Sequence, residues 1–248
     1  MSSTLAFDSP FLRRAVRRRP ACRLFCLPYV GGAASAYAAW PDLLPDRIEC
    51  LAVQLPARED RIRDRPFTES GALVRALAEA MRPYLRGGFA LVGHSSGALL
   101  AFELARATRD RFGAPPRHVF VSGQAPPDQP PRHPPTHALP DAAFLEELSG
   151  REGTAPEILA NRQLLGLLLP GLRADFALWE TYRWEEAEPL ACPITAFGGT
   201  RDGQVDEAEL EGWRRHTSGA FAVRMFEGGH FFFRDQAAGV AGAIAEAL

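Results

Sequence analysis

One serine, Ser95, stands in a sequence context that would make it a nucleophile. It lies in the stretch Gly93-His94-Ser95-Ser96-Gly97, between the short apolar run 89–92 and a run of good helix formers that begins at Ala98. Apolar runs of this length are typical of buried strands, and the residues that follow favour a helix. Glycine permits a sharp turn, and the free amide groups at a helix N-terminus stabilise negative charge. The stretch therefore predicts a reactive serine at a strand-to-helix turn.

A serine nucleophile needs a base and a group that orients the base. Of the six histidines, His230 is the best candidate, because it follows the last strand-like run on a glycine-rich loop. Hydrolases with a Gly-x-Ser-x-Gly turn carry their triad in the chain order serine, acid, histidine. Two aspartates fit that order: Asp202, which follows the run 194–198, and Asp128, which follows the run 118–122. We predict that Asp202 is the acid and keep Asp128 as the alternative.

The other histidines are better explained by structure than by chemistry. His94 lies within the predicted turn, His118 begins a strand-like run, and His216 lies near the end of a predicted helix. His133 and His137 are four residues apart, but the prolines between them prevent the helical face that would present both side chains to a metal. We therefore expect no metal site.

The predicted reaction also needs backbone amides that bind an oxyanion. One amide should come from Ser96, the residue after the nucleophile. The other should come from the glycine-rich loop 28–33, which follows the first clear strand-like run, with Val30 as the first candidate and Tyr29 as the second. The backbone of this loop, rather than its side chains, is thus expected to contact the reacting carbonyl.

Strand-like and helical patterns alternate along most of the chain, and this alternation predicts how the reactive residues are positioned. It indicates a mainly parallel sheet with helices on both faces, and the serine turn is the nucleophile elbow of the α/β-hydrolase fold. We expect the core to comprise residues 21–123 and 191–248. The intervening residues 124–190 begin with a proline-rich run and are predicted to form an inserted helical lid, because a structureless connection of that length would be unusual. The helical patterns in the insertion cover residues 142–148, 156–169 and 171–182.

Composition narrows the class of protein. The chain has 248 residues and a formal net charge of −2, which suits one large domain and gives no bulk charge that favours nucleic acid. Every basic residue is an arginine, so a Schiff-base or phosphate-binding lysine is excluded. No apolar run is long enough to span a bilayer, and the four cysteines suit reduced thiols in a cytoplasmic protein. Residues 1–20 contain five arginines and are expected to form a solvated basic arm.

Four stretches of the chain carry a recognisable set of motifs. They are 24–35 around the glycine-rich loop, 55–61 (Leu-Pro-Ala-Arg-Glu-Asp-Arg), 93–97 at the serine turn and 168–176 (Leu-Leu-Pro-Gly-Leu-Arg-Ala-Asp-Phe). Together they resemble the stand-alone type II thioesterases that serve polyketide and non-ribosomal peptide synthases. The resemblance covers nearly the whole chain after the basic arm.

The resemblance also assigns the remaining residues and shows two departures. Asp202 and His230 fall on the other two triad positions of the family. Ala57 replaces the usual glycine of the second motif, and Ser96 stands where methionine or leucine is commoner. Because Ser96 would donate through its backbone, the oxyanion hole should survive, and the departure bears on substrate preference instead.

The activity that the resemblance implies is hydrolysis of acyl thioesters from the phosphopantetheine arm of carrier proteins. Such an enzyme edits stalled or mis-primed synthase modules through a serine acyl-enzyme. The implied partners are acyl or peptidyl carrier proteins, no cofactor of the protein's own is implied, and we expect a monomer.

The resemblance further implies roles for the insertion and for one charged loop. The insertion would be a lid over an acyl chamber, and four of its apolar residues are expected to line that chamber. These residues are Leu168, Leu172, Phe176 and Trp179. Arg58 and Arg61 are expected to contact the acidic carrier protein, with a solvated charged loop as the equal alternative.

Other functions fit the same motifs. A thioesterase that releases one long acyl chain from a fatty-acid-type synthase would use the same residues, as would a carboxylesterase. A transferase or cyclase would capture the acyl-enzyme with a nucleophile other than water. From a different class, a non-catalytic binding protein could share the fold, but the intact set of Ser95, Asp202 and His230 argues against it.

Overall fold

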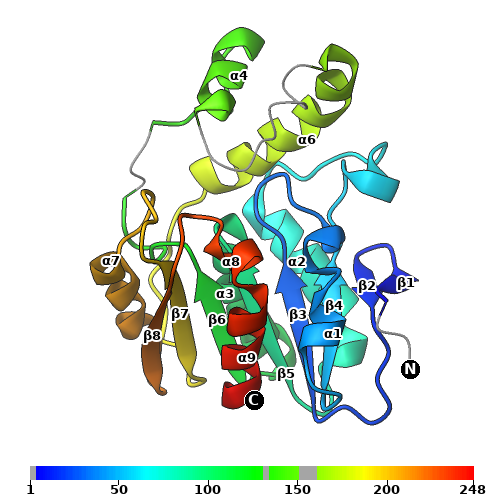
Figure 1. Cartoon of the computed structure of the whole chain (residues 1–248), viewed down its shortest axis with the longest axis vertical. Coiled ribbons are helices and arrows are strands. Elements are labelled where there is room, and N and C mark those ends of the chain that lie inside the picture. Colours follow the sequence, from blue (N-terminus) through cyan, green and yellow to red (C-terminus); the bar gives the residue numbers. More distant parts are fainter. Residues whose placement is uncertain (1–3, 131–133, 151–160) are drawn as a thin grey trace.

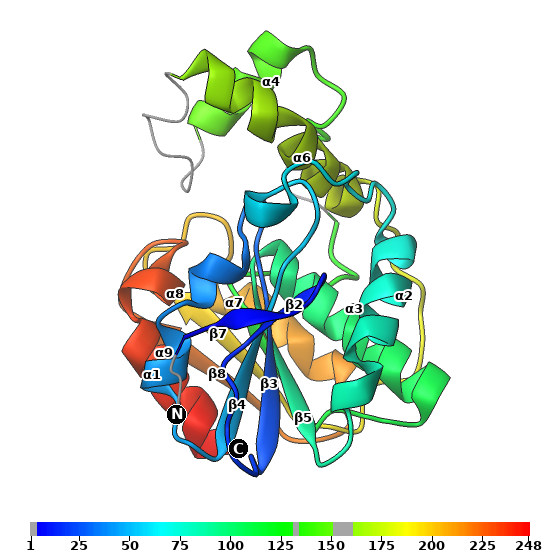
Figure 2. The same ribbon diagram turned by 90° about the vertical axis from the view of Figure 1, so that its right-hand side faces the viewer.

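The computed structural model describes residues 4–130, 134–150 and 161–248, which form one mixed sheet flanked by helices (Figures 1 and 2). Its eight strands lie in the order β1-β2-β4-β3-β5-β6-β7-β8. All neighbours from β4 to β8 in this order are parallel, whereas β2 pairs antiparallel with both β1 and β4. The mainly parallel sheet predicted from the sequence is confirmed. The strands are Ala6–Ser9 (β1), Leu12–Arg14 (β2), Cys22–Leu27 (β3), Ile48–Val53 (β4), Phe89–His94 (β5), His118–Ser122 (β6), Ile194–Gly199 (β7) and Phe221–Phe226 (β8).

Helices cover both faces of the sheet, and each face has its own hydrophobic core. Leu77 of α2 and Leu104 of α3 belong to one core, while Trp40 of α1 and Ile244 of α9 belong to the other. The α-helices are Trp40–Leu43 (α1), Ser70–Met81 (α2), Ser96–Phe112 (α3), Asp141–Ser149 (α4), Arg162–Glu180 (α6), Glu207–Glu211 (α7), Phe232–Asp235 (α8) and Ala237–Ala247 (α9). Short 3-10 helices cover Ala34–Tyr37, Glu59–Arg61, Arg82–Tyr84 and Gly212–His216.

Strand β5 lies inside the sheet and leads to the predicted nucleophile. All of its residues are buried, and it pairs with β3 on one side and with β6 on the other. Successive side chains of a strand point to opposite faces, so Leu91 packs into the core with α3 and Val92 into the core with α9. Because α3 begins only two residues after β5 ends, the backbone is held firmly on both sides of Ser95.

The inserted segment contributes helices α4 and α6, which lie together at one end of the sheet, at the top of Figures 1 and 2. Two helices were expected around Pro170, but α6 continues through this proline. A proline in a helix clashes with the carbonyl four residues earlier, which here belongs to Gly166. A Cβ at Gly166 would meet nothing within 4 Å, so the backbone there has room to adjust. The expected helical pattern at 156–160 lies outside the described residues.

The prediction of a solvated basic arm over residues 1–20 is wrong for the described part of it, residues 4–20. Strands β1 and β2 form a hairpin that adds to the edge of the sheet, and Leu12 is fully buried. Two arginines of this segment pair with acidic residues further along the chain: Arg13 with the exposed Asp60, and Arg14 with the buried Glu49. The acidic partners lie far from these arginines in the sequence. A run of arginines considered alone therefore suggests a solvated tail.

Two expectations from composition can be compared with the described residues. No helix among them is long and apolar enough to cross a membrane. The four cysteines are buried and free.

Candidate active site

Ser95 lies at the turn between β5 and α3. Its backbone has a positive φ, which residues other than glycine rarely adopt. Its φ is +53° and its ψ is −128°, and strained residues of this kind cost on the order of 1–3 kcal/mol. Its amide donates to the Ser122 carbonyl oxygen at 2.7 Å, and its carbonyl oxygen accepts from the Ala98 amide at 2.8 Å. Although Ser95 occupies the N-cap position of α3, its side chain makes no capping bond. This is the backbone geometry of a nucleophile elbow.

Gly93 and Gly97 let three backbone segments meet at this turn. A Cβ on Gly93 would lie 1.9 Å from the carbonyl oxygen of Gly97, and a Cβ on Gly97 would lie 2.4 Å from that of Leu27. Leu27 is the last residue of β3, so the glycine-rich loop that follows it begins directly against the turn. The two predicted sources of oxyanion donors, Ser96 and this loop, are therefore neighbours.

The structure brings His230 and Asp202 together. Nδ1 of His230 lies 2.9 Å from Oδ2 of Asp202, and the exposed fractions of the two side chains are 4% and 0%. Asp202 is itself held in place, because its Oδ1 accepts the Gln204 amide at 2.8 Å. A buried carboxylate at this distance favours the tautomer with the proton on Nδ1. The other ring nitrogen, Nε2, is then the one that can accept a proton.

Asp128, the alternative acid, contacts a different histidine. Its Oδ1 lies 3.0 Å from Nε2 of His216, and its Oδ2 lies 3.2 Å from Nε of Arg215. His216 is buried among the rings of Phe102, Trp184 and Trp213, and this burial lowers its pKa despite the nearby carboxylate. The geometry therefore favours Asp202 as the partner of His230.

His94 packs between the serine turn and the predicted base. Its ring centre lies 4.9 Å from that of His230, and its Nδ1 lies 3.0 Å from the Ser122 hydroxyl oxygen. Complete burial lowers the pKa of His94 well below its usual value, and the charges of His230 and Arg234 lower it further. A neutral imidazole thus holds one side of the His230 ring. Since His94 directly precedes Ser95, this contact also places the predicted base beside the turn.

The two predicted oxyanion donors differ in what surrounds them. Ser96 is buried as the first residue of α3. Val30 is partly buried, and its side chain packs against a small lid core formed by Phe144, Leu148 and Phe176. The predicted lid therefore contacts the loop that carries the second predicted donor.

The four predicted lid residues have different surroundings. Leu168 lines a cavity of about 590 Å³, together with residues of the glycine-rich loop and of α8 and α9. Leu172 packs against that loop, since a Cβ on Gly31 would lie 2.8 Å from Cδ2 of Leu172. Phe176 packs inside the lid core, and Trp179 packs against the core that contains α3. Leu168 is thus the one of the four that faces the described cavity.

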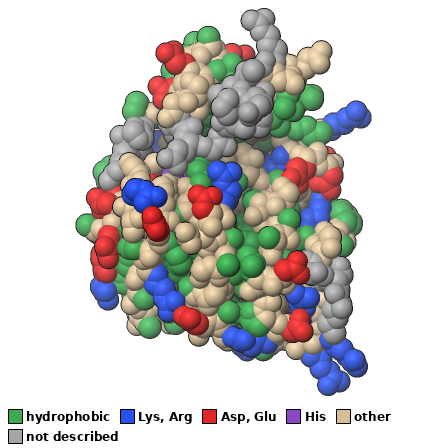
Figure 3. Space-filling view, in the orientation of Figure 1, with side chains coloured by type: hydrophobic (Ala, Val, Ile, Leu, Met, Phe, Trp, Pro, Cys, Tyr) green, Lys and Arg blue, Asp and Glu red, His purple; other side chains and the backbone are tan. Residues whose placement is uncertain are grey.

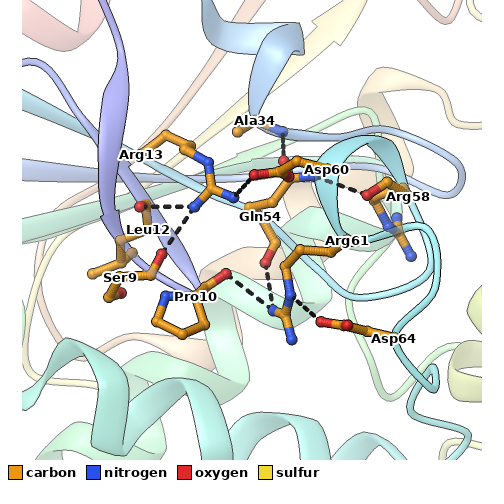
Figure 4. Close-up of polar contacts among 10 residues, drawn as sticks. All are labelled: Ser9, Pro10, Leu12, Arg13, Ala34, Gln54, Arg58, Asp60, Arg61 and Asp64. Atoms are coloured by element: carbon orange, nitrogen blue, oxygen red, sulfur yellow. Dashed lines mark hydrogen bonds and ion pairs between the residues drawn. The ribbon is translucent and has the colours of Figure 1, made fainter.

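The prediction that Arg58 contacts a carrier protein is wrong, because its side chain is 7% exposed and paired with Asp175. Arg61 is also engaged within the protein: it pairs with Asp64 and donates to the Pro10 carbonyl (Figure 4). Its guanidinium also packs over the Phe11 ring. Guanidinium groups that already form ion pairs and hydrogen bonds within the protein are not free to bind a carrier protein. In the same loop, Arg63 and Arg65 are exposed.

Asp175 is a site residue that reasoning from the sequence missed. It is 4% exposed and contacts both Arg58 and the glycine-rich loop. The signal was available, because Asp175 follows Leu168 and Leu172 at the spacing of one helix face and is the acidic residue of that face. A carboxylate on an apolar helix face indicates a buried partner.

Comparisons with known proteins place the chain in a family. The model of the thioesterase domain family matches residues 22–248. The Gramicidin S biosynthesis protein GrsT of Aneurinibacillus migulanus is 42% identical over 222 residues, which cover 90% of this chain and 87% of GrsT.

Two solved structures are similar over almost their whole length. The type II thioesterase BorB from the borrelidin biosynthetic cluster superposes with a TM-score of 0.86 and 33% identity, covering 98% of each chain. ClbQ from the colibactin NRPS/PKS pathway superposes with a TM-score of 0.86 and 32% identity, covering 91% of this chain and 96% of ClbQ. The similarity thus extends over the core and the lid together.

Proposed function

This chain belongs to the thioesterase domain family, and from this premise we propose that it releases acyl groups from the phosphopantetheine arm of carrier proteins. It is a thioester hydrolase with the α/β-hydrolase fold. The proposed task is to clear acyl groups that stall or mis-prime a polyketide or non-ribosomal peptide synthase. Support comes from the relatives, which act in gramicidin S biosynthesis, in the borrelidin cluster and in an NRPS/PKS pathway.

In the proposed mechanism, Nε2 of His230 takes the proton from the Ser95 hydroxyl as its oxygen attacks the thioester carbonyl. The amides of Ser96 and Val30 bind the oxyanion of the tetrahedral intermediate. The intermediate collapses, His230 returns the proton to the leaving sulfur, and an acyl-Ser95 ester remains. Water activated by His230 then releases the carboxylic acid and restores the serine. Asp202 keeps His230 in the required tautomer and stabilises its cation.

The observation that carries this proposal is the buried contact between His230 and Asp202 beside the strained Ser95 turn. Ser95, Asp202 and His230 each follow a strand of the same sheet, β5, β7 and β8, and their chain order is that of the elbow hydrolases. No cofactor is needed beyond the phosphopantetheine that the substrate carries. We also propose that the protein is a monomer that works with its synthase in the cytoplasm.

The test of bond type compares an acyl-carrier thioester with an oxygen ester of the same acyl group. We expect kcat/KM to be at least about tenfold higher for the thioester, a difference of about 1.4 kcal/mol. Preference for the oxygen ester would instead indicate a carboxylesterase. A sharp optimum for one long acyl chain would indicate chain release rather than editing, and failure of a fluorophosphonate probe to label Ser95 would indicate a binding protein.

A further inference from the structure

Asp175 of the lid helix α6 binds the loop that carries the proposed oxyanion donor. Its Oδ2 accepts the Gly31 amide at 2.8 Å and Nη1 of Arg58 at 3.0 Å, while its Oδ1 accepts Nη2 of Arg58 at 2.7 Å. A carboxylate with a bidentate arginine and a backbone donor is among the stronger polar arrangements in proteins. The side chain of Asp175 is therefore fully engaged, and it joins the lid to the core.

Arg58 holds the same loop from the other side. Its Nη1 also donates to the Gly32 carbonyl oxygen at 2.8 Å, so one guanidinium contacts both the lid and the loop. The buried Gln54 ties the two loops to each other, because it accepts the Ala34 amide at 2.8 Å and donates to the Arg58 carbonyl at 3.3 Å (Figure 4). The backbone that follows Val30, at residues 31–34, is thus held by side chains from distant parts of the chain.

The loop itself is a tight turn with a defined direction for its amides. The Gly32 amide donates to the Tyr29 carbonyl oxygen at 2.8 Å, and Gly31 has a φ of +72°. These are the features of a type II turn over residues 29–32, in which glycine takes the third position. The Tyr29–Val30 peptide is trans, so its N–H points away from the carbonyl that is held inside the turn. The direction of the Val30 amide therefore depends on how the whole turn is held.

We infer that Asp175, together with Arg58, positions the type II turn so that the Val30 amide completes the oxyanion hole. The lid helix is then part of the catalytic apparatus as well as a cover, because the residue that holds the turn lies on α6. Apolar packing acts in the same direction, since Val30 and Leu172 both pack against the lid core. This inference rests on the proposed function, in which Val30 is an oxyanion donor.

The first test substitutes Asp175→Asn and measures steady-state hydrolysis of an acyl-carrier thioester. The amide keeps the shape of the side chain but cannot provide two charged acceptors to Gly31 and Arg58. We expect kcat to fall by about 10- to 100-fold, somewhat less than for outright loss of an oxyanion donor, with KM nearly unchanged. The matched control is Arg173→Ala on the same helix, because Arg173 ties α6 to the His137 carbonyl and Asp141 but does not contact the turn. We expect this control to leave kcat nearly unchanged.

A second variant separates positioning from folding, because Asp175→Asn leaves a buried arginine without its partner. Arg58→Met/Asp175→Leu replaces the ion pair by apolar groups, an exchange that often preserves stability. We expect this double variant to unfold near the wild-type temperature and still to show the low kcat. Wild-type kcat in either folded variant, or an effect confined to KM, would overturn the inference.

The wild-type enzyme in the same assay separates this inference from the proposed function. If wild type fails to release the acyl group, the proposed function is wrong. If wild type is active and the Asp175 variants are equally active, only the role of Asp175 is wrong.

Discussion

In the proposed mechanism, the contact between His230 and Asp202 prepares His230 to accept the proton of Ser95. Asparagine at position 202 would place an amide donor where the ring needs an acceptor, and so would favour the wrong tautomer of His230. We predict that Asp202→Asn lowers kcat by about 10⁴-fold with little change in KM. Steady-state kinetics with an acyl-carrier thioester measure this effect.

Asp128→Asn is the control for that substitution. It makes the same chemical change after the preceding strand, β6, and removes the contact with His216. We expect kcat to stay near wild type. Equal losses in the two variants would contradict the assignment of Asp202 as the acid.

Site residues that are marked by their neighbours in the sequence could be predicted. The roles of residues that depend on contacts with distant parts of the chain could not. Ser95 is marked by the glycines on either side, and His230 by its place after the last strand. Arg58 and Asp175 are 117 positions apart. The apolar helix face around Asp175 indicates that it has a buried partner, but nothing near it in the chain identifies Arg58 as that partner. Arg58 was therefore interpreted as a surface charge, although it is buried.

Among the secondary-structure elements, the turn between β5 and α3 packs closely against the loop after β3. This packing requires a glycine at position 97. We predict that Gly97→Ala abolishes measurable activity, because its Cβ would lie 2.4 Å from the Leu27 carbonyl oxygen and 2.8 Å from that of Pro28. The loop with the Val30 amide would have to move, at a cost of about 1–3 kcal/mol or more. Activity and the unfolding temperature together report this displacement.

Gly203→Ala is the matched control in the loop after β7. A Cβ there would meet nothing within 4 Å, so we expect wild-type kcat and a wild-type unfolding temperature. A Gly97→Ala enzyme as active as this control would show that the loop and the turn do not pack as described.

Among the helices and strands, those with strong periodic sequence patterns are the ones that the sequence predicts well. The buried strands and the long helix α3 have strong periodic patterns, and their positions were predicted to within a few residues. The hairpin of β1 and β2 was missed because its stability comes from pairing with β4 and from ion pairs such as Arg14 with Glu49. The continuity of α6 was missed because Pro170 predicts a break, whereas packing of Leu165 and Ala174 on either side of it favours one helix.

At the scale of the whole molecule, buried neutral histidines make stability depend on pH. Burial lowers the pKa of His118 to about 4, whereas an unfolded chain binds the proton near pH 6.5. The unfolded state therefore gains the proton first as the pH falls, and stability decreases between about pH 6.5 and pH 4.

The predicted change concerns His118→Phe, which keeps the stacking on Phe120 but removes the titrating group. Urea denaturation at pH 7 and pH 4.5 should show a loss of stability on acidification that is smaller than in wild type by on the order of 2 kcal/mol. The variant also loses the contact with Thr195, but this loss applies at both pH values. Identical acid sensitivity of the two proteins would show that His118 does not contribute.

The distribution of charge over the whole surface bears on how an acidic carrier protein would dock. Basic and acidic side chains are interspersed over the face seen in Figure 3, so docking of an acidic carrier would depend on local groups. We predict that Arg63→Glu/Arg65→Glu raises KM for a carrier-bound substrate but not for a small thioester mimic. The control Arg86→Glu/Arg111→Glu makes the same change of net charge at positions after α2 and at the far end of α3, and should alter neither KM. An equal effect on carrier and mimic would contradict docking at this loop.

The central claim is that Ser95 accepts the acyl group of a carrier-bound thioester. Intact-protein mass spectrometry of an acylated carrier protein, incubated with wild type or with Ser95→Ala, tests it most directly. The account predicts that wild type removes the acyl mass and leaves the free phosphopantetheine thiol, while Ser95→Ala is slower by on the order of 10⁴-fold or more. Deacylation by Ser95→Ala at the wild-type rate, or an acyl-carrier left intact by wild type, would contradict it.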